Sequence, residues 1–304
     1  MAYQGLVAAA VVALGWFVIS NTAANLEARH IASGFAFLER EAGFEIGEAP
    51  FQRYSAADSY LEALVVGLAN TFKVSLAGIV LATLLGAAIG LFLVSANRLL
   101  KAVSRAYVEF LRNVPLLVQL FFWYALITET LPPPPGALQP LPGVFLSNRG
   151  IFFPLPGSAP VLEGFNFSGG LAITPEFAAL LVGLVTYTAA FIAEIVRAGV
   201  VSVSRGQFEA AHALGLTRAL AMRHVVLPQA LRVIVPPLTS QYLNLTKNSS
   251  LAVAIGYPDL VSIANTIINQ TGQAIEGIAI IMAVYLTISL SISVFMNWYN
   301  ARLK

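Results

Sequence analysis

The sequence predicts an all-α polytopic membrane protein with about six transmembrane helices. Hydrophobic residues make up 58% of the 304 residues and charged residues only 11%, and the mean hydropathy is +0.77. This is too apolar for a soluble domain of that length. Residues 74–97 and 277–301 carry no charge over 24 and 25 residues. Each stretch is therefore long enough to cross a hydrocarbon core about 30 Å thick.

Six spans are expected near residues 3–22, 64–96, 108–131, 174–198, 232–256 and 277–300. The first is uncharged, and it fits either a retained membrane anchor or a cleaved signal sequence. The lack of a basic leader and the even number of spans favour the anchor. Thr174-Pro175-Glu176 has the pattern of a helix start, which fixes where the fourth span begins.

Two long segments interrupt the spans and cannot lie in lipid. Residues 23–62 are rich in Glu, and residues 131–173 hold nine of the 16 prolines. The run from Pro132 to Pro135 favours an extended chain that either packs as a cap or presents itself to another protein. We therefore divide the chain into an anchor with an external loop (1–62) and a membrane core (63–304), with an external insertion at 131–173.

Basic residues set the expected orientation. Eleven of the 17 Lys and Arg lie between spans two and three, around the loop at 199–231 and at the C-terminus, whereas Arg29, Arg40, Arg53 and Arg149 lie on the other side. The positive-inside rule places the first group, and both termini, in the cytoplasm. The net charge of +2 then reflects topology and gives no support to a nucleic-acid partner.

The loop at 199–231 predicts two short helices at an angle. From Ser204 to Leu214 the sequence suits an amphipathic helix, with Phe208 and Ala211 on the same face as Leu214. Gly215 then permits a bend, Thr217 suits an N-cap, and a second helix is expected to about residue 226, before Pro228 begins a new direction. The alternative interpretation is an ordinary surface hairpin between two spans.

The same loop contains a spaced motif. It reads Glu209-Ala210-Ala211, Gly215 after three residues, Val225 after nine more, and then Leu227-Pro228. It resembles the cytoplasmic coupling loop of ABC-importer permeases, in which Ile usually stands at the position of Val225. The resemblance implies a type I importer fold and a loop that an ATPase grips.

Other segments extend the resemblance to about three quarters of the chain. They are Gly67-Leu68-Ala69-Asn70-Thr71, the run from Phe110 to Gln119 and the run from Tyr187 to Gly199. Family members usually have Arg-Gly-Thr-Pro where this chain has Arg112-Asn113-Val114-Pro115. That variant, the extra first span and the proline-rich loop resemble the permeases of general L-amino-acid importers.

This resemblance implies the partners. They are two copies of an ABC ATPase subunit, a second similar permease (a heterodimer in preference to a homodimer), an external solute-binding protein that could dock on the external segments, the lipid bilayer and an amino-acid substrate. None of the four lysines follows a glycine, so the chain has no phosphate-binding loop of its own. We expect ATP and magnesium on the ATPase subunit, no cofactor or metal on this chain, and no catalytic residue.

Polar residues inside the spans are the candidates for the substrate path, because a zwitterion needs polar partners in a low-dielectric medium. They are Gln119, Gln241, Asn244 and Lys247. A neutral amide at 241 suggests broad or acidic specificity, since relatives that resemble basic-amino-acid importers have an acid there. The alternatives are a helix–helix hydrogen bond for Gln241 and a lysine stem that reaches the outer interface for Lys247.

Other residues and motifs bear on the alternative functions. Glu194 and Arg197, three residues apart, are expected to form a local ion pair in preference to a proton relay. A secondary transporter or channel for polar solutes would explain the spans, but not the motif spacing, and no inverted repeat is present. A membrane enzyme lacks support because there is no catalytic motif, no cysteine, and His30, His212 and His224 are far apart.

Overall fold

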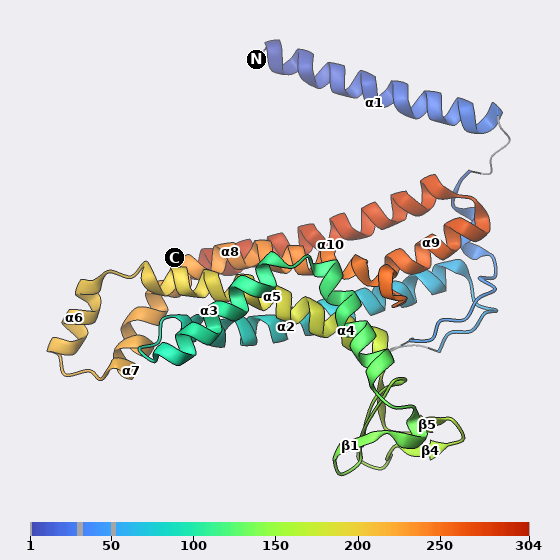
Figure 1. Cartoon of the computed structure of the whole chain (residues 1–304). Helices are drawn as coiled ribbons and strands as arrows, with labels where there is room; N and C mark the ends of the chain where they lie inside the picture. The colour runs from blue at the N-terminus through green and yellow to red at the C-terminus, as the bar shows by residue number, and fades with distance from the viewer. Residues whose placement is uncertain (1, 29–32, 50–52, 304) are drawn as a thin grey trace.

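The computed structural model describes residues 2–28, 33–49 and 53–303 (Figure 1). Arg29, His30 and the C-terminal Lys304 lie outside these ranges. Its helices are α1 (Ala2–Ala28), α2 (Tyr60–Leu93), α3 (Arg98–Asn113), α4 (Leu116–Thr130), α5 (Pro175–Val201), α6 (Arg205–Ala213), α7 (Arg218–Ala221), α8 (Leu227–Asn248), α9 (Leu260–Thr271) and α10 (Ala274–Leu303), with shorter helical turns η1 (Phe35–Glu39), η2 (Pro134–Gly136), η3 (Met222–Val226) and η4 (Ser249–Ile255).

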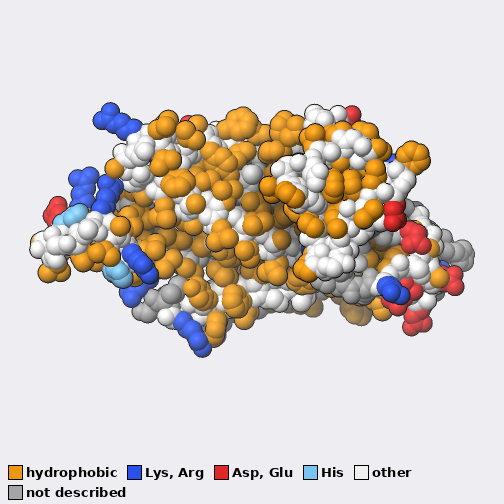
Figure 2. All heavy atoms as spheres, turned by 90° about the horizontal axis from the view of Figure 1, so that it is seen from below, with side chains coloured by type: hydrophobic (Ala, Val, Ile, Leu, Met, Phe, Trp, Pro, Cys, Tyr) orange, Lys and Arg blue, Asp and Glu red, His pale blue; other side chains and the backbone are white. Residues whose placement is uncertain are grey.

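Four of these helices, α1, α2, α5 and α10, are long and apolar enough to cross a membrane. Two further spans are broken: the chain bends by 105° between α3 and α4, and by 51° between the helix that ends in η4 and α9. The prediction of about six spans is therefore confirmed if each bent pair counts as one. Figure 2 shows a hydrophobic belt with Lys and Arg gathered at the α6–α7 end and Asp and Glu at the opposite end.

The third span differs from the predicted helix at 108–131. A helix already begins at Arg98, and it ends at Asn113 because Pro115 forces Val114 into an extended conformation with ψ 128°. The Gln119 amide nitrogen donates to the carbonyls of Leu111 and Val114, both at 3.0 Å. The break therefore has its own hydrogen bonds, and the first half of the span is a separate helix.

Helix α9 lies between the fifth and sixth predicted spans, where the sequence predicted no helix. Asp259 caps it by accepting from the Ser262 amide at 2.8 Å, and Gly272 ends it with φ 72°. Its apolar residues share one face and pack on α2 and η1: Leu260, Ile263, Ala264 and Ile267. The start signal, the spacing of apolar residues and the terminal glycine were all present in the sequence.

The external insertion contains β-strands, which the all-α prediction did not include, whereas that prediction holds for the bundle. The strands are β1 (Leu138–Leu141), β2 (Val144–Ser147), β3 (Gly150–Phe153), β4 (Val161–Glu163), β5 (Asn166–Ser168) and β6 (Leu171–Ile173). They form an antiparallel sheet in the order β1-β2-β3-β6 and a separate β4-β5 hairpin. Phe167 joins the two by stacking on Phe145, with ring centroids 4.5 Å apart. The aromatic contact compensates for strands of only three or four residues.

The segment before α2 packs on the bundle and does not stay a free loop. Glu48 forms an ion pair with Lys73 of α2 and accepts from the Thr174 hydroxyl at 2.8 Å. Asn70 donates to the carbonyls of Glu48 and Pro258, at 2.8 and 2.9 Å. These contacts tie the segment to α2, to the start of α5 and to the turn before α9.

Helix α1 lies apart from the bundle in Figure 1. Its large side chains are exposed on all sides, for example Leu6 at 72%, Trp16 at 74% and Ile19 at 68%. A helix that is apolar all round and lacks contacts with its own bundle needs lipid or another apolar helix around it. Residues 3–22 of this helix have the length and composition of a membrane span.

Helices α2 and α5 form the centre of the bundle. Gly86 and Gly90 of α2 face α5: a Cβ at Gly86 would lie 2.6 Å from Ile192 Cβ, and a Cβ at Gly90 would lie 2.6 Å from Val196 Cβ. Small residues allow helix backbones in membranes to approach closely. Close packing of α2 on α5 therefore explains both glycines.

We expect Gly86→Ala to lower the stability of the purified subunit. The added methyl would meet the Ala189 carbonyl oxygen at 2.9 Å as well as Ile192, and overpacking of this kind costs about 1–3 kcal/mol. Thermal unfolding in detergent measures the effect. Gly15→Ala on α1, where a Cβ would meet nothing within 4 Å, is the control, and equal melting temperatures for the two variants would contradict the packing role.

Candidate functional site

Helices α6 and α7 project from one end of the bundle as a two-helix knob, residues 204–226 (Figure 1). The knob is attached through α6, because Ala211 is buried and Phe208 packs on the core formed by α5 and α8. Glu209 and Ala210 are exposed, and Glu209 lines a groove between the knob and the bundle. The first two residues of the Glu-Ala-Ala motif therefore lie on the surface of the projection, and the last is buried.

Leu214 does not share the buried face that the sequence predicted for it. It is 82% exposed, because α6 ends at Ala213 and Leu214 is the first non-helical residue, with ψ 8°. Leu220, on α7, is also exposed, at 43%. Two apolar side chains therefore stand at the tip of a polar projection, where they offer contacts to another protein.

The predicted bend at Gly215 is confirmed. Gly215 has φ +77°, and its amide donates to the His212 carbonyl at 2.9 Å while the Leu216 amide donates to the Ala211 carbonyl at 3.0 Å. This pair of hydrogen bonds is a Schellman motif, which requires a left-handed residue after the helix. Thr217 then caps α7 by accepting from the Leu220 amide at 3.4 Å, as its position predicted.

Pro228 does not begin a new direction. The chain stays helical from α7 through the π-turn η3 into α8, and Pro228 lies in the first turn of α8. A proline removes one amide donor and its ring crowds the carbonyl four residues earlier, and a π-turn of wider radius accommodates both effects. Gln229 then donates to the Val225 carbonyl at 2.9 Å and to the Gln207 side chain at 3.2 Å, which joins α8 to α6.

A groove of about 570 Å³ runs between the knob and the ends of α2 and α5. Its lining combines apolar residues with charged ones: Val94, Val200, Val201, Val203, Arg205, Phe208, Glu209, His212, Arg218 and Met222. Among the described residues, no ion pair occupies the Glu209 carboxylate. Glu209 is therefore available to a donor from outside the chain.

The predicted path residues of α8 lie on two faces. Asn244 and Lys247 are exposed and follow Ser240 at intervals of four and three, so that all three share one polar face directed away from the core of the chain. Gln241 is half-buried beside that face. Within the described ranges, no hydrogen bond holds the side chains of Gln241, Asn244 or Lys247, so this face is free to meet a solute or another subunit.

Gln119 lies elsewhere. It is buried at the α3–α4 break, away from the α8 face, and its amide nitrogen is already engaged by two backbone carbonyls. The structure thus brings three of the four predicted path residues together on α8. The predicted Glu194–Arg197 ion pair is confirmed, with Arg197 Nε at 2.9 Å from Glu194 Oε2.

These features define a class of protein. An apolar bundle that has a basic end, a charged two-helix projection there and a polar helix face turned away from its own core has the features of a membrane transport subunit. The chain belongs to the family described as binding-protein-dependent transport system inner membrane component, whose sequence profile matches residues 78–304.

This chain is also similar to individual transport proteins. YhdX of Escherichia coli (strain K12) is 44% identical, over 99% of this chain and 93% of its own length. The general L-amino acid transport system permease protein AapQ of Rhizobium johnstonii is 41% identical, over 99% and 91%. A crystal structure of an amino acid ABC transporter with histidines matches 80% of this chain and 95% of its own with a TM-score of 0.61 and 29% identity.

The Schellman motif predicts that Gly215→Val will loosen the knob, because a left-handed conformation costs a residue with a Cβ about 1–2 kcal/mol. Gly215→Asn should be tolerated, since Asn adopts this conformation more readily. Hydrogen–deuterium exchange of residues 205–217 is the measurement. Gly206→Val serves as the control because a Cβ there meets nothing within 4 Å; identical exchange in the Val and Asn variants at 215 would refute the role of the backbone conformation.

Proposed function

We propose that this chain is the permease subunit of an ATP-driven ABC importer that moves amino acids into the cytoplasm by alternating access. The observation that carries the proposal is the motif from Glu209 to Pro228, displayed on a projecting two-helix knob at the basic end of a membrane bundle. The family membership and the transport names of its relatives support the same function.

The knob end is the cytoplasmic end in this proposal. Basic residues gather there in Figure 2, whereas the described basic residues of the opposite end include Arg40, Arg53, Arg149 and Lys73, the last of which is paired with Glu48. The positive-inside rule then orients the bundle in the inner membrane with the β-strand insertion outside and, with six spans, both termini in the cytoplasm. ATP is present on the side where the knob would meet an ATPase.

A separate ATPase subunit supplies the energy, with two copies per complex and with ATP and magnesium bound to them. The tip leucines at 214 and 220 provide apolar contacts, and Glu209 provides a carboxylate for a charged or polar donor. Nucleotide binding then shifts the permease between two states to the extent that the two ATPase–permease arrangements bind it differently.

A second permease completes the path. In the single chain, the α8 face with Asn244 and Lys247 is exposed, and polar or charged side chains at membrane depth belong beside a water-filled cavity or another subunit. We propose that a similar but different permease covers this face, because the motif variant and the external insertion fit the general L-amino-acid subgroup; a homodimer is the alternative. An external solute-binding protein delivers the amino acid.

Gln241, Asn244 and Lys247 are proposed to contact the solute, with Gln119 at the break of the third span as a less favoured member. An amino acid carries one charge of each sign, and in a low-dielectric path each charge needs a polar or charged partner. Lys247 suits a carboxylate, and the amides suit either group. The exposed position of the α8 face is what supports this assignment.

Glu209→Lys should lower ATP-driven amino-acid uptake by more than about tenfold, because it reverses the charge at the centre of a proposed contact. Uptake into proteoliposomes that contain the complete transporter is the measurement. The subunit should still reach the membrane, since Glu209 is exposed. Glu163→Lys on the β4–β5 hairpin makes the same charge change at the other end. Normal uptake in the Glu209 variant would exclude the coupling role.

Gln241→Glu should shift uptake toward arginine, because a carboxylate in the path favours a cationic side chain. Competition among amino acids, measured with the same proteoliposomes, reports the change. Unaltered selectivity would remove Gln241 from the path. A secondary transporter or channel, the second candidate, predicts uptake by the purified permease without any ATPase, and that result would overturn the main proposal.

A further inference from the structure

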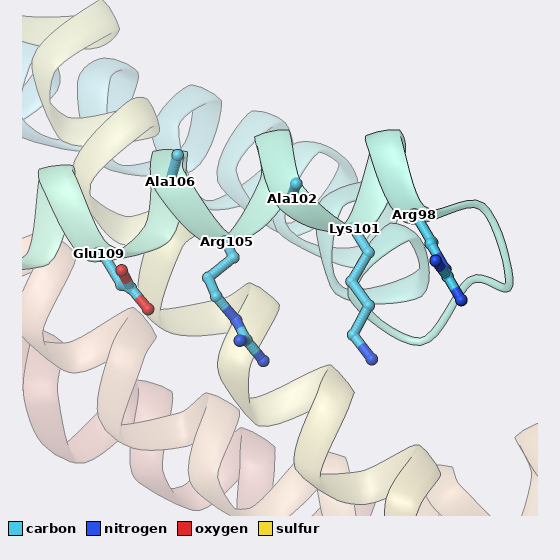
Figure 3. Close-up of a pocket in the computed structure, with 6 residues that line it drawn as sticks. All are labelled: Arg98, Lys101, Ala102, Arg105, Ala106 and Glu109. Atoms are coloured by element: carbon cyan, nitrogen blue, oxygen red, sulfur yellow. The ribbon is translucent and has the colours of Figure 1, made fainter.

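Helix α3 carries one face that is exposed and strongly basic. The face follows intervals of three, four and seven residues, and we call it the basic stripe: Arg98, Lys101, Arg105 and Arg112. Figure 3 shows Arg98, Lys101 and Arg105 projecting to the same side of the helix, together with Glu109. A groove of about 370 Å³ lies along this helix, and its lining also includes Ala102, Ala106 and Glu109.

The other faces of α3 show what surrounds it. One packs on α2 and α5 through the buried residues Ser104, Val108 and Leu111. Another is apolar but exposed, with Leu99 at 72%, Val103 at 61% and Phe110 at 66%. An apolar face left open on a membrane protein meets lipid or an apolar partner, so the basic stripe, on a different side of the helix, points away from that contact.

The stripe reaches well into the bundle. Tyr107, near the middle of α3, donates its hydroxyl to the Thr186 carbonyl of α5 at 2.8 Å. Thr186 lies 15 residues before Val201, the last residue of α5, which is about 22 Å along the helix at 1.5 Å per residue. Helix α3 therefore climbs along α5 from the knob end, and it does not lie flat on a membrane surface as an interfacial helix would.

Charges at that depth need water or partners. On α5, Glu194 is neutralised by Arg197, and Phe191 lies under the Arg112 guanidinium, 5.0 Å from the ring centroid. Glu109 offsets one of the four charges of the stripe. This leaves a net charge of +3 along one wall, and ionisable residues in membrane segments line water-filled cavities and solute pathways.

We infer that the basic stripe of α3 is an anion site on the cytoplasmic half of the path and that it binds the carboxylates of amino acids with a net negative charge. The inference rests on the proposed function and its orientation. A dicarboxylic amino acid gains an ion pair with Lys101 or Arg105 that a neutral one of the same size lacks. The small residues Ala102 and Ala106 leave the groove room for its chain.

The test compares glutamate with glutamine, which differ in one charge and little in size. The variant Lys101→Gln/Arg105→Gln is assembled with the ATPase, the partner permease and the binding protein in proteoliposomes, and ATP-driven uptake of each solute is measured. The ratio of glutamate to glutamine uptake should fall by about tenfold, because a charge-assisted contact is lost for glutamate alone.

Two controls separate charge from folding. Lys101→Arg/Arg105→Lys keeps both charges and should keep the ratio. Arg302→Gln removes a positive charge from α10 at the same end of the bundle and should also keep it. An unchanged ratio in the neutralised variant, or an equal fall for both solutes, would overturn the inference.

A lipid role gives a different result. If the stripe binds phospholipid headgroups, the native ratio stays constant while the uptake of both solutes depends on the phosphatidylglycerol content of the vesicles, and this outcome also rejects the solute site. Failure of the proposed function is recognised separately, because the native complex would then take up neither solute in response to ATP, and the inference would fall with it.

Discussion

The close approach of α2 and α5 is the contact on which the rest of the bundle depends. Lipid tails are as apolar as leucine, so membrane helices gain little from hiding apolar surface and rely on tight packing instead. Gly86 and Gly90 let the two backbones meet without intervening side chains. Helices α3, α4 and α8 pack on α5, and α9 packs on α2. Every element that carries a candidate functional residue is therefore positioned, directly or through one neighbour, by this pair.

Charge placement follows from the same arrangement. Polar and basic side chains at membrane depth cost free energy unless they face water or partners, and they lie on two helices that flank α5: the basic stripe on α3 and the Asn244–Lys247 face on α8. The Glu194–Arg197 pair lies on α5 between them. In the function proposed above, a single chain presents one side of a polar passage, and a second permease closes it.

The sequence predicted the features that have local causes. The Gly215 bend, the Thr217 cap, the Thr174 helix start and the ion pair on α5 depend on residues a few positions apart. Helix α3 was missed because four basic residues resemble a cytoplasmic loop when hydropathy alone is considered. Helix α9 was missed because its 12 residues are too few to cross a membrane, and hydropathy was used to find membrane spans. The strands of the insertion depend on contacts between distant residues, such as Phe145 with Phe167. The pairing of such residues cannot be predicted from the pattern of a short segment.

The π-turn before α8 affects how motion of the knob is transmitted to the membrane helix. Because η3 absorbs Pro228 without ending the helix, one continuous helical rod runs from Arg218 in the knob to Ile255, and its length as far as Asn248 is about 46 Å at 1.5 Å per residue. A flexible joint at Pro228 would have let the knob swivel alone. Without such a joint, a tilt imposed at Arg218 is carried along the helix as far as Pro236 and Pro237, the two prolines inside α8 that lie between the knob and the Asn244 face.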